Sequence, residues 1–133
     1  MSVAAKPVSQ SVSHAGYPTA STAFHWIVTA IGLWTVSGVY IDGWAHSHGM
    51  VDNTFFTIWH ANLYTGIGAM LAFTGINQLL NMRRGYHIFR ALPEGYLLTL
   101  FGAGLFMVGG GFDFMWHSIF GFEVDFELLM SPA

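Results

Sequence analysis

The sequence has 133 residues, the length of a single domain. Hydrophobic residues make up 53% of it and charged residues only 8%, whereas a soluble globular domain carries roughly 25% charged residues. This deficit excludes a disordered chain and an ordinary water-soluble enzyme. Four cations are too few for the phosphate-binding surface of a nucleic-acid binder, so no nucleic-acid partner is expected. Cysteine is absent, which excludes disulfides and thiolate metal sites.

Three apolar runs follow a polar start. Residues 1–22 are small and polar without the pattern of a cleaved signal peptide, and we expect a mobile polar tail there. The runs at 24–41, 55–80 and about 96–112 contain no Asp, Glu, Lys or Arg. Eighteen helical residues reach about 27 Å, close to the hydrocarbon thickness of a bilayer, and three segments cannot close a barrel. The sequence therefore predicts an all-α integral membrane protein, with residues 23–133 forming a three-helix membrane domain.

The basic residues orient these helices. Lys6 precedes the first run, and Arg83, Arg84 and Arg90 lie between the second and the third. The positive-inside rule then predicts a cytoplasmic N-terminus and a C-terminus on the outer face. We expect a multi-pass protein of the cell's inner (cytoplasmic) membrane, or of an internal membrane derived from it. Apolar residues alternate over 120–129, which predicts a short interfacial segment at the outer face.

Small residues within the runs are expected to mediate helix contacts, because they let backbones approach closely. They are Gly32, Ser37, Gly38, Gly66, Gly68, Gly75, Gly102, Ala103 and 109–111. The polar residues Asn62, Asn77 and Gln78 lie in the second run and favour further membrane subunits as partners, besides the lipid bilayer itself.

Histidines and carboxylates gather where the predicted helices meet the outer face. Asp42 and His46 are four positions apart, Asp113 and His117 repeat this offset, and i,i+4 residues share a helix face. His60 follows His46 by fourteen positions, at the start of the next predicted helix. Neutral imidazoles beside carboxylates, without a balancing cation, favour a divalent metal site.

The candidate ligands fall into a main set and additional residues. Asp42, His46 and His60 form the main predicted set. Asp113 and His117 form either a neighbouring half-site or a support that caps the first site. His48 is either a ligand or a loop residue. The alternative for any single interfacial histidine is a hydrogen bond to water or to a carbonyl. Asp52 and Asn53 are expected to start the second helix as turn or N-cap residues.

The stretch YIDGWAHSHGMVDNTFFTIWHANLYTGIGAML resembles the copper-site helices in the C subunit of the copper membrane monooxygenases, the particulate methane and ammonia monooxygenases. That family has an Asp-x3-His-x12-His copper motif at the outer membrane face. Asp42, His46 and His60 are similar to it, with x13 in place of x12. Asp113 and His117 resemble the start of the family's second motif, with Asp in place of Asn; this sequence does not contain that motif's distal His. The DGWAH, FFT-x-WH and DxxWH patterns also resemble related multi-span membrane proteins of unassigned function.

This resemblance implies a metal-binding membrane subunit, with copper as the metal and O2 activation as the chemistry if the subunit is catalytic. Zinc is the alternative metal, because it accepts the same set of imidazole and carboxylate donors. One rival is a non-catalytic structural or assembly subunit of a respiratory or photosynthetic complex. Another is a pigment- or haem-contacting helical subunit, with His60 or His25 as the axial ligand.

Overall fold

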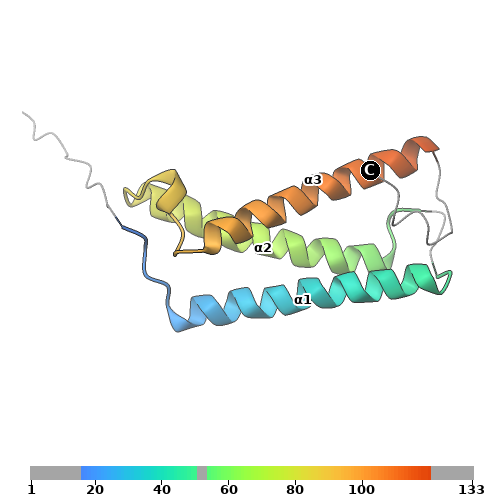
Figure 1. Cartoon of the computed structure of the whole chain (residues 1–133), viewed down its shortest axis with the longest axis horizontal. Coiled ribbons are helices and arrows are strands. Elements are labelled where there is room, and N and C mark those ends of the chain that lie inside the picture. Colours follow the sequence, from blue (N-terminus) through green and yellow to red (C-terminus); the bar gives the residue numbers. More distant parts are fainter. Residues whose placement is uncertain (1–15, 51–53, 121–133) are drawn as a thin grey trace, which may run out of the picture.

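The computed structural model describes residues 16–50 and 54–120, and the regular elements in these ranges are helices joined by turns and loops (Figure 1). They are α1 (Thr22–Ser47), α2 (Ile58–Arg83), the short 3-10 helix η1 (Ile88–Arg90) and α3 (Tyr96–Phe120). α1, α2 and α3 are each long and apolar enough to cross a membrane, which confirms the expectation of three such helices. The predicted interfacial segment at 120–129 lies almost entirely outside the described residues; only Phe120, the last residue of α3, is described.

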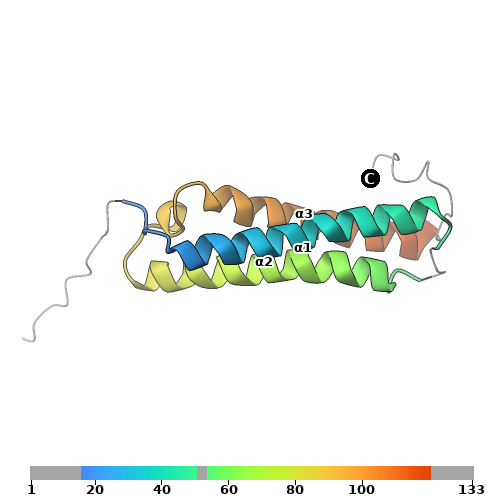
Figure 2. The ribbon, with the colours of Figure 1, turned by 90° about the horizontal axis from the view of Figure 1, so that it is seen from below.

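α1 and α3 both pack against α2, which lies between them in Figure 1, and Figure 2 shows all three long helices running along a common direction. Consecutive helices run antiparallel, so the end of α1, the start of α2 and the end of α3 lie at one end of the bundle. We call this the histidine end. The arginine end, opposite, contains the start of α1, the end of α2, η1 and the start of α3. There Phe24 packs on Tyr96 with ring centroids 5.0 Å apart, which joins α1 to α3.

Both α1 and α3 are longer than their apolar runs. α1 continues past Ile41 to Ser47, and α3 continues past Phe112 to Phe120. The i,i+4 spacings of Asp42 with His46 and of Asp113 with His117 agree with these longer helices. The carboxylates of Asp42 and Asp113 are accommodated on helical turns at the histidine end.

Hydroxyl side chains cap the first two helices. Ser21 Oγ accepts a hydrogen bond from the backbone N–H of Phe24 at 3.1 Å, and Thr57 Oγ1 accepts one from that of His60 at 3.1 Å. The expectation that Asp52 or Asn53 is the N-cap of the second helix is therefore wrong, and the alternative that they form a turn lies outside the described residues. Thr57 has the extended backbone of an N-cap residue and is buried, so its hydroxyl satisfies a donor that water cannot reach.

α1 and α2 approach each other closely at two glycines. A Cβ added to Gly38 would lie 2.8 Å from the Cα of Leu63, and one added to Gly66 would lie 3.1 Å from the Cα of Thr35. Side chains at either position would push against backbone atoms, so glycine is required for this helix spacing. Small residues thus mediate the contact between α1 and α2 as expected.

A small apolar core fills the space around α2. Its buried members are Leu63, Ile67, Met70 and Ala103. On α3 the backbone of Gly110 lies directly against the ring of Tyr64. Other small residues from the predicted set have no neighbour within 4 Å of an added Cβ: Gly68, Gly75, Gly102, Gly109 and Gly111.

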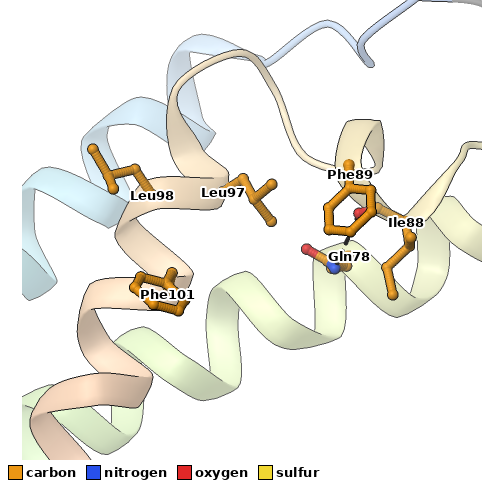
Figure 3. A pocket seen from close by; sticks show the side chains of 6 residues that line it. All are labelled: Gln78, Ile88, Phe89, Leu97, Leu98 and Phe101. Atoms are coloured by element: carbon orange, nitrogen blue, oxygen red, sulfur yellow. Dashed lines mark hydrogen bonds between the residues drawn. The ribbon is translucent and has the colours of Figure 1, made fainter.

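The three amide side chains expected to favour partner helices have partners inside the chain. Asn62 Oδ1 accepts from Trp34 Nε1 at 2.9 Å, and Asn77 Nδ2 donates to the Phe73 carbonyl at 2.7 Å. Gln78 Nε2 donates to the Ile88 carbonyl at 3.3 Å, beside an apolar pocket between η1 and the start of α3 (Figure 3). Gln78 Oε1, by contrast, is buried and has no hydrogen-bond partner among the described residues, so only Asn62 and Asn77 are accounted for without a further subunit.

Replacing Gly38 with Ala should separate α1 from α2 and destabilise the protein by about 1–3 kcal/mol, as overpacking does in well-packed interiors. The measurement is the midpoint of denaturant-induced unfolding in detergent, followed by circular dichroism. Gly68→Ala is the matched control, because an added Cβ there meets nothing within 4 Å. Equal midpoints for the two variants would contradict the close approach.

Candidate metal centre

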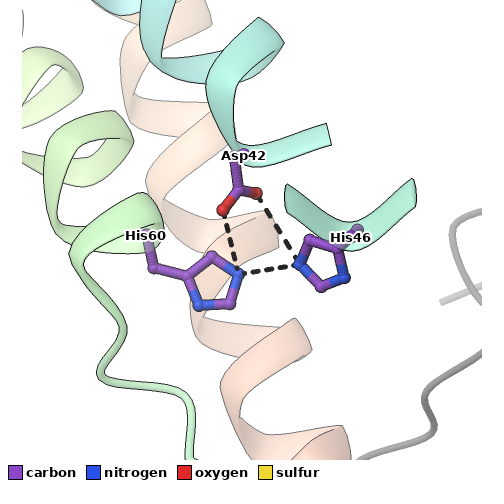
Figure 4. A group of neighbouring side chains, drawn as sticks. All are labelled: Asp42, His46 and His60. Atoms are coloured by element: carbon purple, nitrogen blue, oxygen red, sulfur yellow. Dashed lines mark hydrogen bonds and ion pairs between the residues drawn. The ribbon is translucent and has the colours of Figure 1, made fainter. Parts of the chain in front are cut away.

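Asp42, His46 and His60 converge at the histidine end of the bundle (Figure 4). Each contributes one candidate ligand atom, and these atoms all lie within 4.8 Å of one another. His46 Nε2 lies 3.4 Å from His60 Nε2, and His60 Nε2 lies 3.5 Å from Asp42 Oδ1. The other carboxylate oxygen, Oδ2, lies 3.9 Å from His46 Nε2. The structure thus brings together the three residues that the sequence predicted as the main set.

Each of these side chains is positioned by helix geometry. Asp42 and His46 are one helical turn apart on α1, so they present their polar atoms to the same side. His60 is the third residue of α2, directly after the Thr57 cap, which fixes its backbone. The close approach at Gly38, one turn before Asp42, brings the two helices within reach of one another.

A backbone hydrogen bond orients the His60 ring. His60 Nδ1 lies 2.7 Å from the carbonyl oxygen of Phe55, which can only accept, so Nδ1 carries the proton. In the neutral ring Nε2 then presents a lone pair toward Asp42 and His46. A carbonyl or carboxylate on the distal nitrogen is the usual support of a histidine that binds metal. Phe55 also stacks on the imidazole, with ring centroids 4.7 Å apart.

The carboxylate of Asp42 has an unsatisfied oxygen. Its Oδ1 is buried and has no hydrogen-bond partner among residues 16–50 and 54–120, although it faces the lone pair of His60. A buried acceptor without a donor is costly, and a second lone pair opposite it increases the cost. A cation between these atoms, either a proton or a metal ion, removes both penalties.

His48 lies outside this group. Its Nδ1 lies 2.8 Å from the Trp44 carbonyl, and its ring stacks on the Trp44 indole with centroids 4.5 Å apart. It is the C-cap residue of α1 and is exposed. Of the two sequence-based interpretations, this arrangement agrees with the loop residue.

Asp113 and His117 form a second pair on α3. His117 Nε2 lies 3.3 Å from Asp113 Oδ1, as the i,i+4 spacing predicts. Both residues interact electrostatically with His46, and Asp113 also interacts with Asp42. The pair is not part of the three-residue group, so the structure places it beside that group as a neighbour.

An apolar pocket of about 350 Å³ reaches His60 from the side of α3. Aromatic rings and glycines form most of its wall, together with Thr57 and His60: Phe55, Phe56, Tyr64, Gly110, Gly111 and Phe114. A small uncharged molecule could therefore reach the imidazole without crossing a charged surface.

Sequence analysis missed the two groups that hold His60, the Thr57 hydroxyl and the Phe55 carbonyl. The spacing Thr57-x-x-His60 was a usable signal, because a hydroxyl three residues before a helical residue is a common N-cap pattern. No sequence pattern indicates the role of the Phe55 carbonyl, because every residue has a backbone carbonyl. The other proposed axial ligand, His25, has its Nδ1 within hydrogen-bonding distance of the Tyr96 hydroxyl at the arginine end.

Comparison with protein-family models gave no match, and neither curated proteins nor solved structures gave one.

Replacing Thr57 with Ala should remove the cap of α2 and cost about 1 kcal/mol of stability, while Thr57→Ser should retain most of it. The ring of His60 should also become more mobile, because the residues around it lose their fixed backbone. Thermal unfolding in detergent checks the first effect, and the width of the His60 imidazole signals in NMR checks the second. A Thr57→Ala protein as stable as Thr57→Ser would contradict this role.

Proposed function

We propose that this protein is a metal-binding membrane subunit whose metal is held by Asp42, His46 and His60. The observation that carries the proposal is the buried, unpartnered Asp42 Oδ1 facing an imidazole nitrogen whose tautomer is fixed. Two neutral imidazoles and one carboxylate form a donor set for a divalent transition metal.

The distances are compatible with one shared ion. Metal–nitrogen and metal–oxygen bonds of about 2.0–2.2 Å let two ligand atoms stand up to about 4 Å apart across the ion. The separations of 3.4 Å between the two imidazoles, 3.5 Å from His60 to Asp42 Oδ1 and 3.9 Å from His46 to Asp42 Oδ2 fall below that limit, so the carboxylate would face the ion with both oxygens. Small movements of side chains that already face each other would suffice.

Copper is the proposed metal, and zinc is the alternative. Among divalent ions, Cu²⁺ has the highest affinity for a site of nitrogen and oxygen donors, and imidazole suits copper and zinc alike. The resemblance of these residues to the copper motif of the monooxygenase C subunits also favours copper. A bound copper ion would supply redox chemistry, and the aromatic pocket beside His60 would admit a small apolar reactant.

The proposal extends to the cellular setting. With Arg83, Arg84 and Arg90 at the cytoplasmic side, the N-terminus is cytoplasmic and the metal faces outward, in an inner membrane or a membrane derived from it. Large apolar side chains are exposed along α1 and α3, which lipid or other membrane subunits would cover. In such a complex Asp113 and His117 would support the metal or form a neighbouring half-site.

Metal analysis tests the ligand set directly. The full chain, purified in detergent without added chelator and loaded with Cu²⁺ or Zn²⁺, should retain a single ion after desalting. His46→Ala, His60→Ala and Asp42→Asn should each lower metal affinity by at least about tenfold, since each removes a ligand. Mass spectrometry of metal content gives the stoichiometry, and electron paramagnetic resonance of the Cu²⁺ form should show coupling to imidazole nitrogen.

His48→Ala is the matched control, because His48 is at the same end of α1 but outside the group. It should leave metal content unchanged. Unchanged metal in all three ligand variants would overturn the proposal, and would leave a proton as the cation between Asp42 and His60.

Metal affinity should also depend on pH. The imidazoles bind metal only in their neutral form, so protons compete with the ion. Affinity should therefore fall as the pH is lowered from about 8 to about 5, the interval in which histidine usually changes charge. A titration of Cu²⁺ against a competing chelator at several pH values checks this, and constant affinity over the interval would count against histidine ligation.

A further inference from the structure

The arginine end of the bundle contains a polar pocket of about 480 Å³ between the start of α1 and the end of α2. Thr19 and Ser21 line it from the segment before α1, and Asn81 and Arg84 line it from α2 and its C-cap. Among the residues that line this pocket no Asp or Glu occurs, and Arg84 is the charged one.

The guanidinium of Arg84 is held in place. Its Nη1 donates to Asn81 Oδ1 at 3.1 Å, and buried Asn81 is fixed in turn by donating from Nδ2 to the Ala91 carbonyl at 2.9 Å. This contact uses one of five guanidinium N–H donors. Among the residues that the structure describes, no carboxylate forms an ion pair with Arg84. The positive charge is therefore oriented and not neutralised.

The height of this pocket suits a lipid phosphate. α2 has 26 residues and is about 39 Å long, close to the full thickness of a bilayer with its headgroups. Arg84, directly after its last residue, thus stands at headgroup level. Three of the four basic residues of the sequence, Arg83, Arg84 and Arg90, belong to this end, whereas Glu94 is the one acid between 53 and 113.

We propose that this pocket binds the phosphate of an anionic phospholipid, with Arg84 as the main contact and the hydroxyls of Thr19 and Ser21 as further donors. A planar guanidinium pairs well with phosphate oxygens, and basic pockets between membrane helices are suited to anionic headgroups. The inference is independent of the metal centre, which lies at the opposite end.

The test uses the full chain in vesicles of phosphatidylcholine containing spin-labelled phosphatidylglycerol or spin-labelled phosphatidylcholine. Electron paramagnetic resonance measures the relative association of the two labelled lipids with the protein. The wild-type protein should prefer phosphatidylglycerol by about fivefold, the effect expected of one well-placed arginine. Arg84→Gln should abolish most of this preference.

Arg83→Gln is the matched control, since it removes the same charge from the neighbouring residue, which does not line the pocket. It should keep most of the preference. Arg84→Lys provides a second variant with the charge intact but without the planar fork, and an intermediate preference is expected.

Equal loss in Arg83→Gln and Arg84→Gln would overturn the proposal in favour of diffuse surface charge. The absence of any preference in the wild-type protein would also overturn it. Displacement of phosphatidylglycerol by millimolar inorganic phosphate would show that free phosphate is the ligand and would contradict a lipid site.

Discussion

The close approach of α1 and α2 at Gly38 and Gly66 is the constraint on which the rest of the structure depends. Without a hydrophobic driving force between helices in lipid, association relies on packing, and packing at this distance requires the absence of a side chain. Gly38 is one turn from Asp42, and its neighbour Leu63 is three residues from His60. The spacing of two backbones therefore sets the separation between a carboxylate and an imidazole.

The two ends of this bundle have opposite chemistry. At the histidine end, Asp42 presents a buried oxygen that no donor within the described ranges satisfies, so a cation would stabilise it. At the arginine end, Arg84 presents an oriented cation that pairs with no carboxylate in the described part of the chain, which is the basis for the proposed anion site. Both sites lie at the ends of the bundle. There, helix termini and loops supply polar groups such as the Phe55 carbonyl and the Asn81 amide.

Much of the site was predictable because helical periodicity is local. The i,i+4 spacing placed Asp42 with His46, and Asp113 with His117, before any tertiary contact was known. The start of the second helix was less predictable, because apolar composition does not show at which residue helical hydrogen bonding begins. The N-cap is an example: the sequence favours Asp52 and Asn53, whereas the buried hydroxyl of Thr57 caps α2.

The sequence by itself determined three apolar helices and the polar residues that follow them. An apolar run long enough to cross a bilayer can satisfy its backbone hydrogen bonds there only as a helix, unless it joins a closed barrel. Only the tertiary structure decided that His60 joins Asp42 and His46 while His48 turns to Trp44, and that Asp113 and His117 stand beside the group. Which histidines share a point depends on how α1 rotates and packs against α2, and that packing depends on contacts between residues far apart in the chain.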